Sequence, residues 1–250
     1  MVVAFPCYAA AMPLDEYRRK RDFTRTPEPR GKGKPRKRGG GKPKPLYFCV
    51  QKHLASRLHY DLRLEHDGVL LSWAVPKGPS LDHRDRHLAV RTEDHPREYG
   101  DFEGVIPEGY GQGIVMLWDH GTWKPEIDDV DAALAKGDLK FALDGYKLKG
   151  SWALVRTRDR PDTSPSQRGR SWLLIKHRDF WSGPLDITTF APLSVKSEGD
   201  FDDILAADLP DVWVTGRAAA RGGATGRALR EIIEKAAAKK LARDDQESAP

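Results

Sequence analysis

The sequence of 250 residues lacks the features that would place it in a membrane or in an oxidising compartment. No stretch approaches the roughly 18 uncharged apolar residues that a membrane-spanning helix needs. Cys7 and Cys49 are too few for a disulfide scaffold or a four-thiolate zinc site. Residues 1–12 have no basic region ahead of their apolar residues, so we interpret them as a leader without a signal peptide, with Met12 as an alternative start. These absences predict a cytoplasmic protein with no membrane partner.

Positive charge is concentrated at the N-terminus. Residues 1–45 carry a net charge of +9, whereas the remaining residues carry −4. Within this region, residues 31–45 (GKGKPRKRGGGKPKP) hold seven lysines and arginines and no apolar side chain except proline's. Such a segment has nothing to bury, so we expect 1–45 to be a basic, largely disordered arm. The arm is either a solvated linker or a contact for a phosphate backbone, and the two roles are compatible.

Residues 46–187 are typical of β structure. Short runs rich in β-branched and aromatic residues are separated by turn residues; they cover residues 47–51, 58–64, 69–75, 87–92, 114–118, 147–156 and 171–176. Asp67-Gly68 indicates a hairpin, and residues 130–136 are the one clear helix in this region. The pattern predicts a mainly β fold, a compact closed β-barrel with a few peripheral helices. Residues 188–250 form a C-terminal extension with a helix at about 225–243.

The histidines offer the first chemical signal. In residues 58–65, apolar and polar residues alternate, which places His59, Asp61 and Arg63 on one face of a strand. A turn at residues 54–57 could fold His53 back beside them. Two histidines and a carboxylate suit a divalent transition metal such as manganese or iron, and Arg63 could then grip a bound anion. The alternative is an amphipathic strand with a solvated polar face.

Residues 93–99 (EDHPREY) follow an expected strand and contain a proline, so we expect a loop. In it, His95 could act as a general acid or stabilise a developing negative charge, and Tyr99 could donate a hydrogen bond to a phosphate oxygen. The alternative is an ordinary surface loop. Residues 104–113 are glycine-rich but match neither a P-loop nor a Rossmann motif, and we expect a turn there.

Longer motifs carry a family resemblance. The run VQKHLASRLHYDLRLEHDGVLLSWAVPKGPS, followed by EDHPREYGDFEGVIPEG and WDHGTW, closely resembles the 3′-phosphoesterase module of bacterial DNA ligase D, which also occurs as a stand-alone protein. The resemblance extends over roughly residues 14–185, including LDEYRRKRDFTRTPEP in the arm. It implies a compact β-barrel and a manganese-dependent hydrolase. Such an enzyme removes a 3′-terminal ribonucleoside from DNA and then the remaining 3′-phosphate, leaving a 3′-OH for repair by non-homologous end joining.

The resemblance also implies roles for matched residues. His53, His59 and Asp61 match the metal ligands. Arg63, His95 and Tyr99 match the catalytic groups at the scissile phosphate, and Gln51, Lys77 and His87 match positions of substrate contact. Two positions depart from the family pattern: His87 stands where an arginine is usual, and PEGYGQG is one residue shorter than the usual turn.

The sequence leaves other functions open. It contains no Lys-x-Asp-Gly motif, the nucleotidyl-lysine motif that a ligase needs, so the DNA would be sealed by a separate ligase. A polymerase or Ku would be further partners, in the bacterial or archaeal nucleoid. A non-catalytic module that binds DNA ends through the arm is the main alternative to a 3′-phosphoesterase. A non-haem Fe(II) oxygenase would share the ligand set, but nothing in the sequence marks a cosubstrate site.

Overall fold

The computed structural model of the protein describes residues 14–31, 45–107, 110–207 and 223–247. Within these ranges the elements follow the order α1 (Asp15–Arg19), β1 (Leu46–Leu54), β2 (Leu58–His66), β3 (Val69–Val75), β4 (His87–Arg91), β5 (His95–Pro96), η1 (Arg97–Asp101), β6 (Gly104–Ile106), β7 (Gly113–Pro125), α2 (Val130–Lys136), β8 (Asp138–Gly145), β9 (Lys149–Arg156), η2 (Pro165–Gln167), β10 (Ser171–Lys176), α3 (Ile187–Phe190), α4 (Phe201–Ala207) and α6 (Gly223–Glu247).

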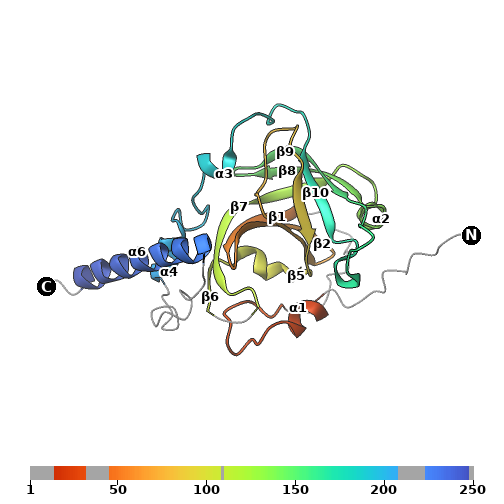
Figure 1. Ribbon diagram of the computed structural model, residues 1–250. Coiled ribbons are helices and arrows are strands. Elements are labelled where there is room, and N and C mark those ends of the chain that lie inside the picture. The colour runs from red at the N-terminus through yellow and green to blue at the C-terminus, as the bar shows by residue number, and fades with distance from the viewer. Residues whose placement is uncertain (1–13, 32–44, 108–109, 208–222, 248–250) are drawn as a thin grey trace, which may run out of the picture.

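Eight antiparallel strands close into a barrel (Figure 1). Their order is β1-β2-β3-β4-β10-β9-β8-β7, and β7 pairs again with β1. The short strands β5 and β6 lie outside this ring, paired with β3 and β7. The prediction of a mainly β, closed barrel with a few peripheral helices is therefore confirmed. Closure leaves the eight main strands without an unpaired edge.

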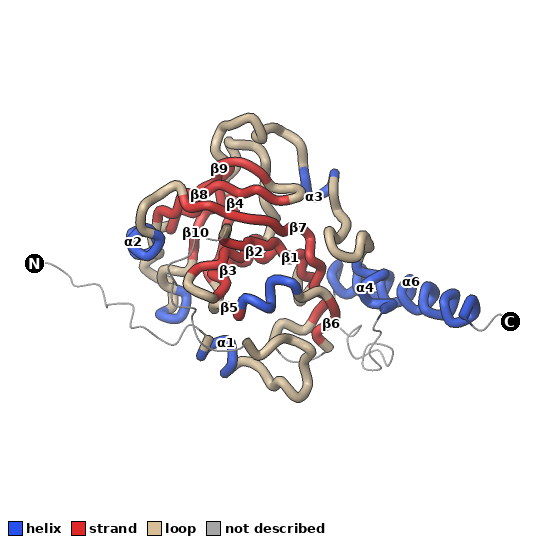
Figure 2. Tube along the Cα trace, turned by 180° about the vertical axis from the view of Figure 1, so that it is seen from behind, coloured by secondary structure: helices blue, strands red, loops and turns tan. Residues whose placement is uncertain are grey.

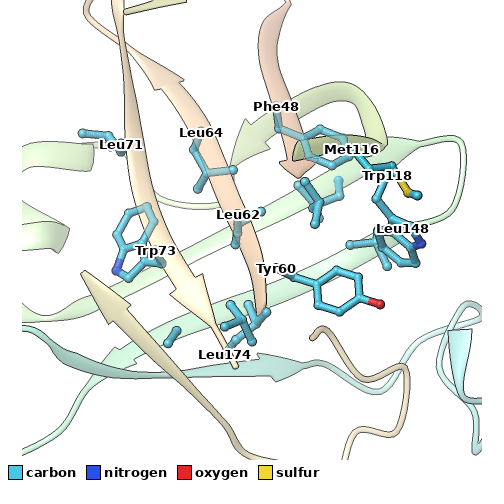
Figure 3. Packing of buried hydrophobic residues seen from close by; sticks show 14 of the residues in the cluster. Phe48, Tyr60, Leu62, Leu64, Leu71, Trp73, Met116, Trp118, Leu148 and Leu174 are labelled. Atoms are coloured by element: carbon cyan, nitrogen blue, oxygen red, sulfur yellow. The ribbon is translucent and has the colours of Figure 1, made fainter. Parts of the chain in front are cut away.

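The inside of the barrel is filled by apolar side chains. On β2, the residues that alternate with the polar ones, Tyr60, Leu62 and Leu64, point inward and are at most 5% exposed (Figure 3). Trp73 and Trp152 are fully buried in the same core. A remaining void among these side chains measures only about 10 Å³, which is room for about one water molecule. The polar groups of β1 and β2 therefore have to act on the outer face of the barrel.

A second, smaller apolar cluster covers that outer face. Tyr17 of α1, Leu70 of β3 and Tyr99 of η1 are at most 2% exposed and pack together. The ribbon of Figure 1 and the tube of Figure 2 both place α1 near β5. The hydroxyl of Tyr17 donates to the carbonyl of Pro29 at 2.7 Å, which closes the segment 14–31 on itself. This segment therefore covers part of the outer face of the sheet.

The expected arm, residues 1–45, is described only over residues 14–31 and at residue 45, and 14–31 is packed against the barrel. Its basic run at 32–44 lies outside the described residues. The helix expected at about 225–243 lies within α6, where Leu229 and Ala236 are buried in a cluster shared with Ile204 and Leu205 of α4. No helix in the described parts of the chain is long and apolar enough to cross a membrane.

Candidate active site

The candidate site begins at the β1–β2 hairpin. The expected turn is present, because β1 ends at Leu54 and β2 begins at Leu58. His53 is thereby paired directly with His59, and Gln51 with Asp61. Opposite residues of an antiparallel pair project to the same face, so both histidines and the carboxylate meet outside the barrel. The strand alternation seen in the sequence thus produces one polar cluster.

The three candidate ligands are close enough to share a metal ion. Nδ1 of His53 lies 3.8 Å from Oδ2 of Asp61, and Nε2 of His59 lies 3.7 Å from Oδ1 of the same residue. All three ligand atoms fall within 4.8 Å of one another. A metal ion bonded at about 2.0–2.2 Å holds two ligand atoms no more than about 4.4 Å apart. The donor set therefore fits a divalent transition metal after small side-chain rotations.

The outer nitrogens of both histidines contact main-chain carbonyls. Nε2 of His53 lies 2.9 Å from the carbonyl oxygen of Gly111, and Nδ1 of His59 lies 2.9 Å from that of Arg57. A carbonyl can only accept, so each of these nitrogens carries the proton. The remaining nitrogen of each ring faces the Asp61 carboxylate. This orientation of imidazoles by neighbouring groups is typical of metal ligands.

Arg63 lies next to the ligands on β2 and is almost fully engaged. Its Nε donates to Oε1 of Gln51 at 2.7 Å, Nη1 to the hydroxyl of Ser72 at 2.8 Å, and Nη2 to Oδ2 of Asp61 at 3.0 Å. Nη1 also lies 2.9 Å from Nδ1 of His95. Burial raises the pKa of Asp61, but the charge of Arg63, with contributions from both histidines, outweighs it and holds that pKa well below its usual range.

His95 lies between two arginines. Besides Arg63 at Nδ1, Nη2 of Arg21 approaches its Nε2 to 3.4 Å. The residue is 4% exposed, and burial together with the two cations holds its pKa well below 6.5. His95 is thus neutral at physiological pH. It belongs to β5 and is followed by η1, where the sequence predicts a loop, because His95 pairs with Leu70 of β3.

Tyr99 packs against both partners. Its ring centre lies 4.8 Å from the imidazole of His95 and 4.8 Å from the guanidinium carbon of Arg63. Burial raises the pKa of its hydroxyl well above 10, so the group stays protonated. The structure therefore brings together six of the residues that the sequence singled out, and these are His53, His59, Asp61, Arg63, His95 and Tyr99.

The three residues expected to contact substrate are placed differently. Gln51 is fully buried and supports the site from behind, since its Nε2 donates to the carbonyls of Tyr99 and Phe102 while its Oε1 accepts from Arg63. Lys77 is exposed beyond the end of β3, near the start of β2. His87 lies at the same end, with Nδ1 donating to the carbonyl of Gly78 at 2.7 Å. Neither Lys77 nor His87 shares a described hydrogen bond with the metal-binding set.

The segment 14–31 adds charged groups beside the site, although the sequence predicted this segment only as part of a basic arm. The guanidinium of Arg21 pairs with Glu28 at 2.7 Å and with Glu93 at 3.2 Å, and Lys20 pairs with Glu93 at 2.9 Å. Glu28 and Glu93 are at most 5% exposed, so these are buried ion pairs. A usable signal was present, because residues 14–29 and Glu93 are all part of the motifs that carry the family resemblance.

Comparison with known proteins agrees with the family resemblance of the sequence motifs. Residues 51–156 match the family model of the DNA Ligase D 3′-phosphoesterase domain. The chain is 53% identical over 193 residues to the multifunctional non-homologous end joining protein LigD of Pseudomonas aeruginosa, an alignment that covers 76% of this chain and 22% of that protein. It is 47% identical over 145 residues to the multifunctional non-homologous end joining DNA repair protein LigD of Mycobacterium tuberculosis, covering 58% of this chain and 18% of the relative. The chain thus spans about a fifth of the length of these relatives.

Proposed function

We propose that the chain, whose residues 51–156 match the family model of the DNA Ligase D 3′-phosphoesterase domain, is a Mn²⁺-dependent phosphoesterase that processes DNA 3′ ends. It would remove a 3′-terminal ribonucleoside and a 3′-phosphate, leaving a 3′-OH for non-homologous end joining. The observation that carries the proposal is the cluster of His53, His59 and Asp61 directly beside Arg63 and His95.

His53, His59 and Asp61 would hold the metal ion. A bound Mn²⁺ would neutralise phosphate charge and lower the pKa of a water molecule. The contribution of this chain is to keep Asp61 ionised and all three ligands aligned. Arg63 stabilises the Asp61 carboxylate, and the carbonyls of Arg57 and Gly111 fix the two imidazoles.

Arg63 would bind the phosphate. Its guanidinium has five N–H groups, of which three donate to Gln51, Ser72 and Asp61 and a fourth lies against His95. The fifth, on Nη2, is on the same nitrogen that contacts Asp61. A phosphate oxygen near the metal ligands would therefore meet a donor whose position is set by three other hydrogen bonds. Such a group costs little reorganisation when negative charge develops on the phosphate.

His95 would act as a neutral hydrogen-bonding group. Because its pKa is depressed by burial and by Arg63 and Arg21, it does not compete with them as a third cation. Tyr99 limits the motion of the imidazole and of Arg63 by packing against both. In the phosphatase step, a water oxygen bonds to phosphorus, the bond from phosphorus to the 3′ oxygen breaks, and that oxygen takes up a proton.

The experiment is an end-processing assay. A 5′-labelled primer–template ending in a 3′-phosphate, and a second one ending in a single ribonucleotide, are incubated with the protein in Mn²⁺ or in a chelator. We expect both to end as a 3′-OH, in Mn²⁺ only. His59→Ala should abolish both reactions, whereas His83→Ala, a change at an exposed histidine outside the site, should leave them unchanged.

Two outcomes would contradict the proposal. Turnover in the chelator would show that the reaction needs no metal ion. No turnover of either substrate in Mn²⁺, with DNA binding retained, would favour the non-catalytic end-binding module instead. The sequence contains no Lys-x-Asp-Gly motif, so we expect no sealing of nicks by this chain, and a separate ligase would act on its product.

A further inference from the structure

A surface cavity of about 570 Å³ lies within the segment 14–31. Three arginines, one aspartate, one phenylalanine and one glycine line it, namely Arg18, Arg21, Asp22, Phe23, Arg30 and Gly31. None of these residues is among the site residues expected from the sequence. A cavity with three guanidinium groups in its wall is suited to an anion with several oxygen acceptors.

Two of the three arginines are available for a ligand. Arg21 is compensated by Glu28 and Glu93. Arg18 donates only to the carbonyl of Gly31, at 3.5 Å, and the guanidinium carbon of Arg30 lies 5.2 Å from the ring centre of Phe23. Within the described residues, no carboxylate oxygen lies within 4.0 Å of the Arg18 or Arg30 guanidinium. Their charges therefore face the cavity without a partner of opposite sign at contact distance.

Asp22 is the one acidic group in the wall. Its Oδ1 accepts from the main-chain N–H and the hydroxyl of Thr24, at 3.1 and 2.7 Å. These hydrogen bonds lower its pKa, so the residue is ionised and offsets part of the positive charge. The charge of Arg30 also lowers the pKa of Asp22, so Asp22 offsets part of the Arg30 charge, but it makes no ion pair within 4.0 Å with Arg18 or Arg30.

The cavity adjoins the active site. The Arg21 side chain that lines it also reaches His95, with Nη2 at 3.4 Å from Nε2. On the other wall, Gly31 has a φ of +74° and lies so close to Pro96 that a Cβ at residue 31 would come within 2.6 Å of the Pro96 Cβ. Pro96 follows His95 directly. A DNA strand with its end at His95 would therefore pass the cavity within a few nucleotides.

We propose that Arg18 and Arg30 bind a phosphodiester of the DNA whose 3′ end is being processed. This subsite rests on the proposed function. It would position the strand without reading its bases, because guanidinium contacts to phosphate carry no sequence information. The phosphodiester belongs to either the primer or the template strand, and the experiment separates the two.

The first test is DNA binding in a chelator, so that no turnover occurs. The variant Arg18→Gln with Arg30→Gln is compared with Arg158→Gln with Arg160→Gln, which removes the same charge from two exposed arginines between β9 and β10. Each lost phosphate contact reduces the slope of log K against log salt by about 0.7–0.9. Because both arginines contact a single phosphodiester, we expect a slope change of about 0.7–0.9 for the cavity variant, so its deficit against the wild type shrinks by about 2.6–3.5-fold between 50 and 200 mM salt.

Two controls keep the test decisive. Arg18→Lys with Arg30→Lys should recover the salt slope, since it keeps two cations, and melting temperatures show whether each variant folds. In Mn²⁺, turnover of the 3′-phosphate substrate should require a higher DNA concentration in the cavity variant, whereas Arg158→Gln with Arg160→Gln should turn over like the wild type. Uncharged methylphosphonate linkages, placed one at a time in the primer or template strand, then locate the phosphodiester. The position that matters should weaken binding to the wild type but not to the cavity variant.

The subsite is overturned if the cavity variant binds with the same affinity and salt slope as the β9–β10 control, or if every methylphosphonate weakens the wild type and the cavity variant equally. This result is distinct from a failure of the proposed function. If the wild type turns over no substrate in Mn²⁺, the phosphoesterase assignment falls, while the binding comparison still decides whether Arg18 and Arg30 hold a phosphodiester.

Discussion

Replacing Arg63 with lysine tests whether its geometry or only its charge matters. The guanidinium donates hydrogen bonds in three directions, to Gln51, Ser72 and Asp61, at 2.7 to 3.0 Å. A lysine Nζ is a single point and cannot reach all three acceptors. Two or more of them would lose their donor in a place where Arg63 itself is 3% exposed.

The structural cost follows from those lost donors. A buried acceptor left without a partner costs about 1–3 kcal/mol. Two such losses lower the free energy of unfolding by roughly 2–6 kcal/mol, which corresponds to a fall in melting temperature of about 4–24 °C for a chain of this size. Loss of one donor to the developing charge should also reduce kcat by about 10²–10³-fold.

The assay combines thermal melting with turnover of the 3′-phosphate substrate in Mn²⁺. Arg97→Lys is the matched control, because the Arg97 side chain is 33% exposed and makes its ion pairs with Asp101 and Glu65 near the surface. Such pairs contribute little, so the control should melt within a few degrees of the wild type and retain its kcat. If Arg63→Lys melts and reacts like this control, then Arg63 supplies charge alone and its three hydrogen bonds to Gln51, Ser72 and Asp61 do not matter.

Three further predictions concern single residues. Asp61→Asn should lower the affinity for Mn²⁺ by at least about 100-fold in calorimetry, since even changes behind the ligands cost 10–100-fold; equal affinity would rule out the ligand assignment. His95 is held neutral in the folded state, so below about pH 6.5 the unfolded state binds one more proton than the folded state. Lowering the pH should therefore reduce the free energy of unfolding of the wild type by up to about 1.4 kcal/mol per pH unit, a loss that His95→Gln should not show. Parallel stability curves from pH 7 to 5 would contradict this. Burial raises the pKa of Cys49 to about 12, so iodoacetamide should modify Cys49 only after denaturation, as measured by peptide mass spectrometry. Rapid modification of Cys49 in the native protein would show that its thiol is accessible to solvent.

Local sequence was enough for much of the barrel. The strand Val69–Val75 and the helix Val130–Lys136 were predicted with their observed bounds. The helix carries its own signals, with the Asp129 side chain accepting from the N–H of Ala132 and Gly137 ending it in the left-handed region. Strand β8 was missed, although its burial alternates regularly, because lysine and aspartate interrupt a run with few β-branched residues.

The polar face of β2 was also determined by sequence. Because side chains of a strand alternate, the order His59, Asp61, Arg63 is sufficient to place all three on one face. The same alternation sends Tyr60, Leu62 and Leu64 into the barrel. What the pattern left open was whether His53 joins the polar face, and that depended on a turn whose shape local sequence does not fix.

Only the tertiary structure decided what surrounds that face. Pairing of β1 with both β2 and β7 closes the barrel, and the segment 14–31 then packs over the site and brings Arg21 to His95, 74 residues away in sequence. Such contacts depend on the summed burial of Tyr17, Leu70 and Tyr99, and on the pairing of Glu28 and Glu93 with Arg21. A sequence pattern records which residues prefer burial or pairing. Which distant partner satisfies that preference is settled only when the whole chain folds, because the free energy of packing belongs to both partners together.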